Sequence, residues 1–354
     1  MVCFIHTADW QLGAPNLPPA CQYPLEKLIE AAKAKDVNII LCAGDIFHKA
    51  QPDQRTKDYL LKTIIDNQNM LFIFMAGNHD FINKNRDYSS LRYLSLLATC
   101  KRLSNVRVID PGRYITHDAA IFWALDEWGD IEETVPPETR EKPLVAIWHG
   151  IVPGINIKTL AMNVENKLVS AIEKAGIHYV ALGDIHKQWK INNRCYYPGC
   201  LTQTAYVDEL SALIVDVTTS NIKVSILDLD LPRKMVFHVE FTNGEDTEDS
   251  IIEFVKATAR KGNLVKLKFN LPVEEYAGIN KPYVKEQLKE HCITLDFDND
   301  PVLNVRSRVD IDKIARAQTF EQEVDVILDN EKFDLDTSKL KQMVLEILQH
   351  SVSE

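Results

Sequence analysis

Near its N-terminus the chain reads Val2-Cys3-Phe4-Ile5-His6-Thr7-Ala8-Asp9-Trp10-Gln11, an apolar run followed by a carboxylate and an amide. Further stretches repeat this arrangement of a buried strand and then polar side chains. They are Ala43-Gly44-Asp45, Gly77-Asn78-His79-Asp80, Trp148-His149-Gly150 and Gly183-Asp184-Ile185-His186. Because the carboxyl ends of strands in an α/β sheet converge on one crevice, we expect these side chains to share a site. Carboxylates, an amide and imidazoles without thiolates favour a pair of divalent ions.

Bulk composition limits the class of protein. At 354 residues the chain can bury more than one core, so we expect two domains and an appendage. No run approaches the roughly 18 to 20 apolar residues of a membrane span, and no signal-peptide pattern opens the sequence. The seven cysteines lack zinc-ribbon or paired-disulfide spacing, which predicts a reducing, cytoplasmic setting. A net charge of -11 argues against wrapping DNA unaided, although bound dications or a basic partner would offset it.

The hydrophobic periodicity alternates strands and helices. Pro24 fits the first turn of one helix and Asp53 the N-cap of the next, so the first strands are joined by crossover helices. After Asn105 the pattern changes to short strands, with a helix expected at Val164–Ala175 and a closing hairpin after Ala212. We therefore predict an α/β fold with two sheets packed face to face and helices outside.

Leu229-Asp230-Leu231-Pro232-Arg233 marks a predicted domain boundary. Residues 233–312 alternate strands and helices as a small α+β unit, with a last strand at Val302–Val309, and contain none of the polar stretches. Residues 313–354 are predicted to be helical. Their apolar stripe at helical spacing consists of Leu340, Met343, Val344, Ile347 and Leu348.

Together the polar stretches resemble the calcineurin-like metallophosphoesterases, whose pattern runs D-x-H, G-D, G-N-H-D, H and G-H-x-H. More narrowly, His6-Thr7-Ala8-Asp9-Trp10-Gln11-Leu12-Gly13 is similar to the SbcD-type nucleases, the nuclease subunits of a double-strand-break repair complex. Gly44-Asp45-Ile46-Phe47-His48 with Pro52, and Tyr197-Pro198-Gly199, share this resemblance. It implies a two-sheet αββα metallophosphoesterase sandwich in 1–232, an α+β DNA-capping domain in 233–312, and a helical segment in 313–354 that docks on an ATPase partner.

The resemblance also implies the metal ligands. Metal one is expected on Asp9, Gln11, Asp45 and His186. Metal two is expected on Asp45, Asn78, His149 and Asp184. Among the catalytic residues, His79 is expected to protonate or stabilise the leaving oxygen. Asp80 would orient His79, and His48 would contact a phosphate.

Two positions depart from the family pattern. Gln11 and Asp184 stand where the family has histidine. An amide oxygen is a weaker ligand than imidazole, whereas Asp184 adds an oxygen ligand and negative charge. We therefore predict an oxygen-rich site for two Mn²⁺ ions per subunit, with Mg²⁺ as the alternative.

The function implied is that of a metal-dependent DNA nuclease in repair, recombination or replication. It would be a 3′ to 5′ exonuclease on duplex ends and an endonuclease on single-stranded or hairpin DNA. The expected partner is an SbcC-type coiled-coil ABC ATPase, bound by the stripe in 313–354, with the chain as a homodimer within a heterotetramer. This chain lacks a phosphate-binding loop of the Gly-x-x-x-x-Gly-Lys-Ser/Thr type and is not expected to bind ATP itself. The implied location is the cytoplasm, at the nucleoid, or the host cytoplasm for a phage protein.

Alternative interpretations stay open from the residues alone. The same scaffold serves phosphoesterases of small molecules or phosphoproteins. Gln11 and Asp184 also fit a metal-weakened structural subunit of the ATPase complex. Taken individually, His149 could be a core histidine, and His6 could make a structural hydrogen bond. The C-terminal stripe could belong to an ordinary amphipathic helix.

Overall fold

The computed structural model describes residues 1–82, 88–126, 141–152, 155–156, 161–162, 172–239, 247–271 and 273–300. The chain divides into two compact units. The first comprises 1–236, 253–266 and 285–296, and the second 237–252, 267–284 and 297–354. All of the polar stretches singled out in the sequence belong to the first unit.

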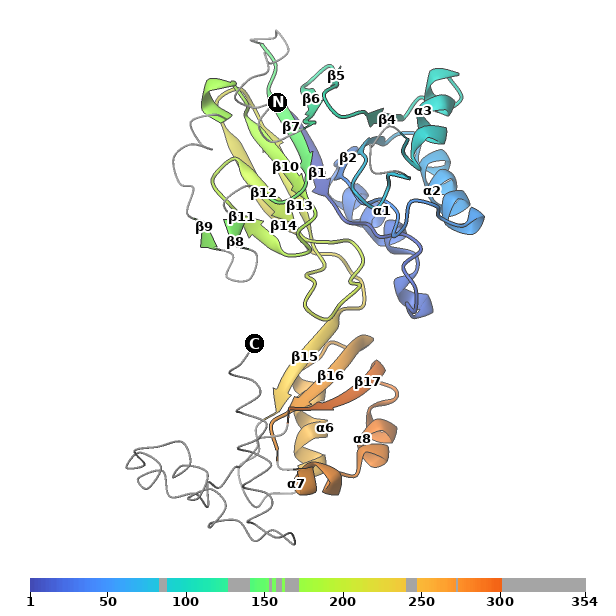
Figure 1. The fold of residues 1–354 in the computed structure, drawn as a ribbon, viewed down its shortest axis with the longest axis vertical. Coiled ribbons are helices and arrows are strands. Elements are labelled where there is room, and N and C mark those ends of the chain that lie inside the picture. The colour runs from blue at the N-terminus through green and yellow to red at the C-terminus, as the bar shows by residue number, and fades with distance from the viewer. Residues whose placement is uncertain are drawn as a thin grey trace, which may run out of the picture. The chain divides into compact units, whose positions relative to one another are not determined.

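The first sheet has six strands in the order β14-β13-β1-β2-β3-β4 (Figure 1). Its strands are β1 (Val2–Thr7), β2 (Ile39–Ala43), β3 (Leu71–Met75), β4 (Val106–Ile109), β13 (Ala212–Val217) and β14 (Ile222–Leu227). Strands β1 to β4 run parallel, and β13 pairs antiparallel with β1. The crossover helices are α1 (Pro24–Ala34), α2 (Gln54–Asp66) and α3 (Arg92–Thr99), and a 3-10 turn η1 spans Pro19–Cys21. Four parallel strands therefore end at one edge of this sheet.

The second sheet also has six strands, in the order β11-β12-β10-β7-β6-β5. Its strands are β5 (Tyr114–Thr116), β6 (Ile121–Ala124), β7 (Leu144–His149), β10 (Tyr179–Gly183), β11 (Gln188–Lys190) and β12 (Cys195–Pro198). Strands β6, β7, β10 and β12 run parallel. A separate short hairpin consists of β8 (Ile155–Asn156) and β9 (Ala161–Met162).

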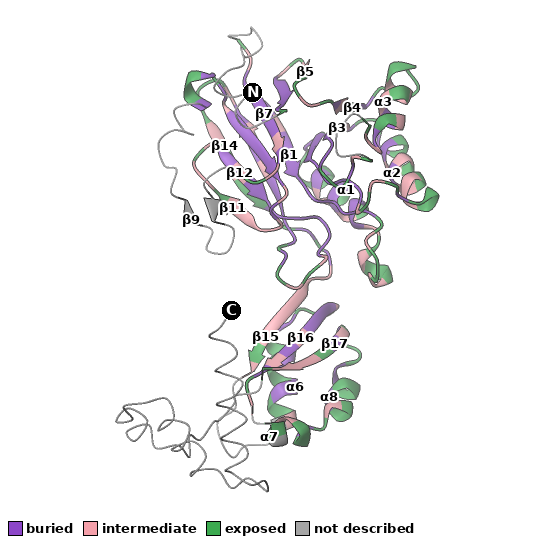
Figure 2. Ribbon diagram, in the orientation of Figure 1, coloured by how far each residue is buried: buried purple, intermediate pink, exposed green. Residues whose placement is uncertain are grey.

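The central strands of both sheets are largely buried (Figure 2). Their alternating side chains belong to different layers of the core. Phe4 points into the layer between the sheets, where it meets Phe122 and Tyr179 edge to face. Its neighbour Ile5 belongs to the layer beneath the crossover helices. These buried layers confirm the prediction of two sheets packed face to face in a metallophosphoesterase-type sandwich.

Local signals in the sequence account for the helix starts. Pro24 occupies the first turn of α1, as predicted. The Asp53 carboxylate accepts a hydrogen bond from the Thr56 amide at 2.8 Å and caps α2. Both helices turn their apolar stripes to the first sheet, which fixes the loops that follow each strand.

A third sheet of three strands has the order β15-β16-β17. Its elements are β15 (Lys234–Val239), α6 (Thr247–Thr258), β16 (Asn263–Phe269), α7 (Val273–Gly278), α8 (Lys281–Leu288) and β17 (Cys292–Asn299). This alternation confirms a small α+β part after the sandwich. Strand β17 was not predicted, and the strand expected at Val302–Val309 lies outside the described residues.

Several predictions fall on residues that the structure does not describe. Most of the helix expected at Val164–Ala175 does so, as does all of 313–354, including Leu340, Met343, Val344, Ile347 and Leu348. The domain limits at 232 and 312 remain predictions. Within the described ranges, no helix combines the length and the apolar character that crossing a membrane requires.

Candidate metal centre

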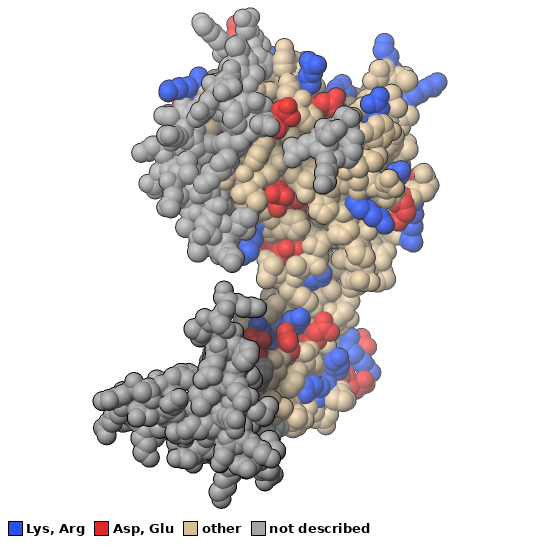
Figure 3. Space-filling view, viewed as in Figure 1, with Lys and Arg blue, Asp and Glu red and all other residues tan. Residues whose placement is uncertain are grey.

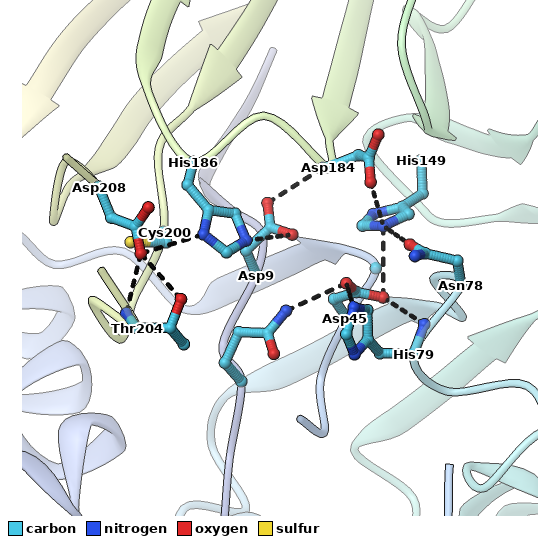
Figure 4. Close-up of polar contacts among 12 residues, drawn as sticks. Asp9, Asp45, Asn78, His79, His149, Asp184, His186, Cys200, Thr204 and Asp208 are labelled. Carbon is cyan, nitrogen blue, oxygen red and sulfur yellow. Dashed lines mark hydrogen bonds and ion pairs between the residues drawn. The ribbon is translucent and has the colours of Figure 1, made fainter. Parts of the chain in front are cut away.

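The five polar stretches meet at the carboxyl ends of β1, β2, β3, β7 and β10 (Figure 4). The Asp9 amide donates to the Gly44 carbonyl at 3.0 Å, which joins the loops after β1 and β2. The Asp184 amide donates to the Asp9 carboxylate at 3.0 Å and links the second sheet to the first. Asp9, Asp45 and His149 present possible ligand atoms that all lie within 4.8 Å of one another. Strand ends distant in sequence therefore form a single site.

The backbone of this site is unusual. Asp9, Gln11, Asp45 and Asp184 have φ values of 51°, 49°, 54° and 93°, in the left-handed region that residues with a Cβ rarely adopt. Such conformations persist where the surrounding structure enforces them and concentrate at functional sites. Here they turn successive strand ends so that the side chains face one another.

Two glycines allow the loops to approach closely. A Cβ on Gly77 would lie 2.2 Å from the Asp45 Oδ1 atom, and one on Gly183 would lie 2.0 Å from the Ala43 carbonyl oxygen. No side chain fits at either distance. The glycines therefore bring β3 and β10 close enough to β2 for their ligands to converge.

The residues expected at metal two surround the His149 imidazole. Its Nε2 atom lies 2.8 Å from Asn78 Oδ1, 3.3 Å from Asp45 Oδ1 and 3.7 Å from Asp184 Oδ1. Its Nδ1 atom donates to the Ala43 carbonyl at 2.7 Å. A neutral His149 consequently turns the Nε2 lone pair toward three oxygen atoms, and a proton or a cation on Nε2 stabilises this arrangement.

The residues expected at metal one are arranged differently. Asp9 is fully buried, and its Oδ1 atom has no hydrogen-bond donor although it lies 3.5 Å from His186 Nε2. The Gln11 amide nitrogen donates to Asp45 Oδ2 at 3.1 Å, and its oxygen accepts from His48 Nδ1 at 2.9 Å. Gln11 thus joins Asp45 to His48 and lies beside the expected metal-one residues.

The charges of the site explain its pKa values. Although burial opposes it, the negative charge of Asp45 raises the pKa of His149 to about 10. Against a similar burial effect, Asp208 and Asp9 raise the pKa of His186 to about 10. Burial raises the pKa of Asp184, whereas His149 lowers that of Asp45 despite its burial. The pocket is therefore rich in negative charge and stabilises cations.

His79 lies at the solvent side of the site, with 43% of its side chain exposed. Its backbone amide donates to Asp45 Oδ1 at 2.8 Å, and its Nδ1 atom donates to the His48 carbonyl at 2.7 Å. The rings of His48 and His79 are 5.8 Å apart between centroids. Both imidazoles are therefore placed where a substrate could reach them.

Asp80 is buried behind this loop. Its carboxylate accepts hydrogen bonds from the backbone amides of Ile46, Phe47 and Gly77 at 2.9 to 3.1 Å. Burial and the nearby Asp45 charge raise the pKa of Asp80 to about 7. Asp80 therefore braces the loops after β2 and β3. The orientation of His79, expected from Asp80, is provided by the His48 carbonyl instead.

A divalent metal pair fits this donor set. The orphaned Asp9 oxygen, the His149 Nε2 atom among oxygens and the clustered Asp9 and Asp45 carboxylates all favour positive charge at this point. Without metal, protons on His149 and His186 can supply it, and a divalent pair would take their place. The ligands are oxygen and imidazole, which suit Mn²⁺, Mg²⁺, iron or zinc. Asp45 lies between the two groups, as a bridging carboxylate should.

The sequence did not predict that Asp208 and Cys200 lie beside His186. Asp208 lies 3.3 Å from His186 Nδ1, and Cys200 lies in the same cluster. Asp208 follows no strand in the pattern that revealed the other residues. No local signal pointed to it, because its position depends on the fold of the 199–210 loop.

With this geometry in hand, comparison with known proteins gives the family. The model of the calcineurin-like phosphoesterases matches residues 4–188, more than half of the chain. The chain belongs to the calcineurin-like phosphoesterase family, a family that uses a dimetal centre. This confirms the predicted superfamily and a phosphoesterase type of hydrolase.

Individual relatives are distant. Protein 078R of Invertebrate iridescent virus 3, named as a candidate phosphoesterase, is 23% identical over 297 residues, 80% of each chain. A dimetal phosphatase from Danio rerio is similar at 12% identity, over 65% of this chain and 99% of that one, with a TM-score of 0.37. The Pseudomonas putida nuclease MPE is similar at 16% identity, over 39% of this chain and 57% of that one, with a TM-score of 0.24.

Proposed function

We propose that this phosphoesterase is a metal-dependent DNA nuclease, the SbcD-type subunit of an SbcCD-like complex that acts in DNA repair, recombination or replication. The observation that carries the proposal is the set of family ligands converging around Asp45, with His48 and His79 at its open side. The SbcD-like opening motif and the small α+β part after the sandwich narrow the substrate to DNA. Exonuclease action on duplex ends and endonuclease action on hairpins follow from the same resemblance.

In this proposal Asp9, Asp45 and His186 hold metal one, and Asp45, Asn78, His149 and Asp184 hold metal two. When bound, such a pair binds phosphate, lowers the pKa of a water molecule and stabilises the attacking and leaving oxygens. Gln11 joins the first group if its amide turns its oxygen inward.

The chain's own residues supply the proton chemistry. His79 donates its Nδ1 proton to the His48 carbonyl, which leaves Nε2 facing the site, 3.8 Å from Asp45 Oδ2. In its doubly protonated form the ring also carries a proton on Nε2, and it can donate this proton to the leaving oxygen of a phosphodiester and become neutral with its Nδ1 proton still on the His48 carbonyl. His48, held by Gln11, is placed to contact the scissile phosphate or its neighbour.

The proposed ATPase partner would supply basic surface for holding DNA. On the face shown in Figure 3, the described Lys and Arg side chains lie mixed with Asp and Glu and form no continuous basic surface. Together with the net charge of -11, this favours an ATPase partner that contributes to holding duplex DNA. The proposed docking residues are those of the 340–348 stripe, and a homodimer would complete the heterotetramer.

A small-molecule or phosphoprotein phosphoesterase is the second candidate. The mixed surface charge favours it, because a small phosphoester needs no basic surface. End-labelled duplex and hairpin DNA and nitrophenyl phosphate, each with Mn²⁺ and with or without a co-expressed ATPase partner, separate the two. DNA cleavage that Asp45→Asn abolishes supports the nuclease. Hydrolysis of nitrophenyl phosphate alone, with DNA untouched even beside the ATPase, would overturn it.

A further inference from the structure

The His186 imidazole lies between two carboxylates (Figure 4). Its Nε2 atom is 3.5 Å from Asp9 Oδ1, on the metal-one side. Its Nδ1 atom is 3.3 Å from Asp208 Oδ2, on the side away from the site. The backbone of the same residue is also held, because its carbonyl accepts the Glu209 amide hydrogen bond at 2.7 Å. Asp208 and its neighbour thus contact His186 at both ring and backbone.

Asp208 is itself firmly fixed. It is 9% exposed, and its Oδ2 atom accepts from the Thr204 amide at 2.8 Å, the Thr204 hydroxyl at 2.9 Å and the Ala205 amide at 2.7 Å. The Gln203 side chain holds the same loop, donating to the Asp208 carbonyl at 2.5 Å and accepting from the Lys234 amide at 2.7 Å. A carboxylate with so many donors has little freedom to move.

His149 shows the same arrangement with a different acceptor. There Nδ1 donates to a neutral group, the Ala43 carbonyl, and Nε2 faces the metal-two oxygens. A hydrogen bond on the distal nitrogen fixes the tautomer that presents a lone pair to a metal, and a carboxylate in that position also raises the basicity of the ring. Metal one has an amide, Gln11, where metal two has a carboxylate, Asp184, so a more basic imidazole would strengthen the poorer site.

We propose that Asp208 is the positioning residue for His186. By accepting the Nδ1 proton it holds the ring in the tautomer whose Nε2 lone pair faces metal one. The inference rests on the proposed metal-one role of His186. It does not depend on whether DNA is the substrate.

The alternative hypothesis is that His186, Cys200 and Asp208 bind a separate ion. Their possible ligand atoms lie within 4.8 Å of one another. The geometry favours the positioning role. Asp208 Oδ2 lies among hydrogen-bond donors, the Thr204 amide and hydroxyl and the Ala205 amide, and this environment suits a further N–H donor from His186 and disfavours a cation. The Cys200 thiol is directed to the Glu209 carbonyl at 3.5 Å.

The decisive variant is Asp208→Ala in the full chain. The Oδ2 atom that faces His186 Nδ1 is the same atom that accepts from Thr204 and Ala205, so only removal of the carboxylate takes this acceptor away. None of the described contacts would then hold the proton on Nδ1, and the tautomer that carries its proton on Nε2, which cannot ligate, becomes populated. Mn²⁺ titration followed by electron paramagnetic resonance should show a tenfold or greater loss of affinity at one site and none at the other.

The matched controls are Glu209→Gln and Cys200→Ser. Glu209 is the adjacent carboxylate and accepts from the Gln188 amide at 2.9 Å, so its loss should leave both Mn²⁺ affinities unchanged. Thr204→Val removes a single donor to Asp208 and should weaken one site about threefold, which keeps the test valid if Asp208→Ala fails to fold. Equal loss in Cys200→Ser and Asp208→Ala would establish the separate ion site and overturn the inference.

The tautomer gives a second readout. In ¹⁵N-histidine spectra of the Zn²⁺-loaded protein, the hydrogen-bonded His186 Nδ1 proton should be observed in the wild type and lost to exchange with water in Asp208→Ala, with the signal assigned by His186→Gln. An unchanged Nδ1 proton signal and unchanged affinities in Asp208→Ala would refute the positioning role. If the wild-type protein does not cleave DNA but still binds Mn²⁺ in a way that depends on Asp208, only the proposed nuclease function is refuted.

Discussion

His79 is distinguished from the ligands by its place at the solvent side of the site. Less than half of its side chain is exposed, and its ring is oriented through the His48 carbonyl. The proposed metal ligands lie deeper, with their side-chain atoms directed to one another instead. This difference in position agrees with the proposal that His79 acts on the substrate and the deeper residues hold cations.

His79→Ala should therefore slow phosphoester hydrolysis without removing metal. We expect kcat to fall by about 10²- to 10⁴-fold, the usual contribution of a general acid. Mn²⁺ affinities, measured by calorimetry, should match the wild type. Loss of one Mn²⁺ site in this variant would make His79 a ligand and contradict the assignment.

His6 carries a prediction about stability. It is fully buried, accepts from the Tyr179 hydroxyl at 2.8 Å and donates to the Leu182 carbonyl at 3.1 Å, which confirms the structural role expected from sequence. Burial lowers the pKa of His6 to about 3, from about 6.5 in the unfolded chain. The unfolded chain consequently binds the extra proton between these values, so His6 stabilises fully above pH 6.5 and loses that contribution as the pH falls.

Urea unfolding at pH 7.5 and pH 5 checks this directly. The wild type should lose about 2 kcal/mol through His6 over that interval. The variant His6→Gln, which keeps a donor and an acceptor, should lack this part of the loss. Identical pH dependence in the two proteins would show that His6 titrates normally.

Most of the side chains that converge at the candidate metal centre could be predicted, because each follows an apolar strand in a recognisable motif. The place of Asp208 in this group and the hydrogen-bond partners of Asp80 could not be predicted. Their contacts are set by loops whose conformation depends on tertiary hydrogen bonds, such as those of Thr204 and Gly77. Sequence patterns carry no record of such contacts.

At the level of elements, the close approach of β10 to β2 decides whether the ligands converge. The Gly183 position leaves no room for a Cβ beside the Ala43 carbonyl. The strands that were predicted well, β1, β2, β3, β7 and β10, are buried apolar runs. Strands β11 and β12 are only three and four residues long, too short to show a period of two. Strand β17 was missed although Ile293, Leu295 and Phe297 alternate with polar residues.

Gly183→Ala should push β10 away from β2. We expect a loss of about 2 to 3 kcal/mol in the free energy of unfolding and weaker binding of both metals. Gly278→Ala is the control, since a Cβ there meets nothing within 4 Å. Urea melts and Mn²⁺ titration of both variants make the comparison. A Gly183→Ala protein as stable and as metal-competent as the Gly278 variant would contradict this account.

On the scale of the whole molecule, the sandwich and the small α+β part follow the order read from the sequence. The exact domain limits could not be read, since Leu229-Asp230-Leu231-Pro232-Arg233 signals a break but not how the following strands pair. The net charge of -11 opposes the binding of a polyanion such as DNA. In the proposed function, cations at the centre and a partner would offset this charge.

The proposed function requires that separate strand ends hold a pair of cations. Anomalous diffraction at the manganese edge, from crystals soaked in Mn²⁺, tests it most directly. We predict two peaks roughly 3.5 to 4 Å apart, bridged by Asp45, with His186 on one ion and His149 on the other. A single peak, or a peak on Cys200 away from Asp45, would contradict the two-metal account.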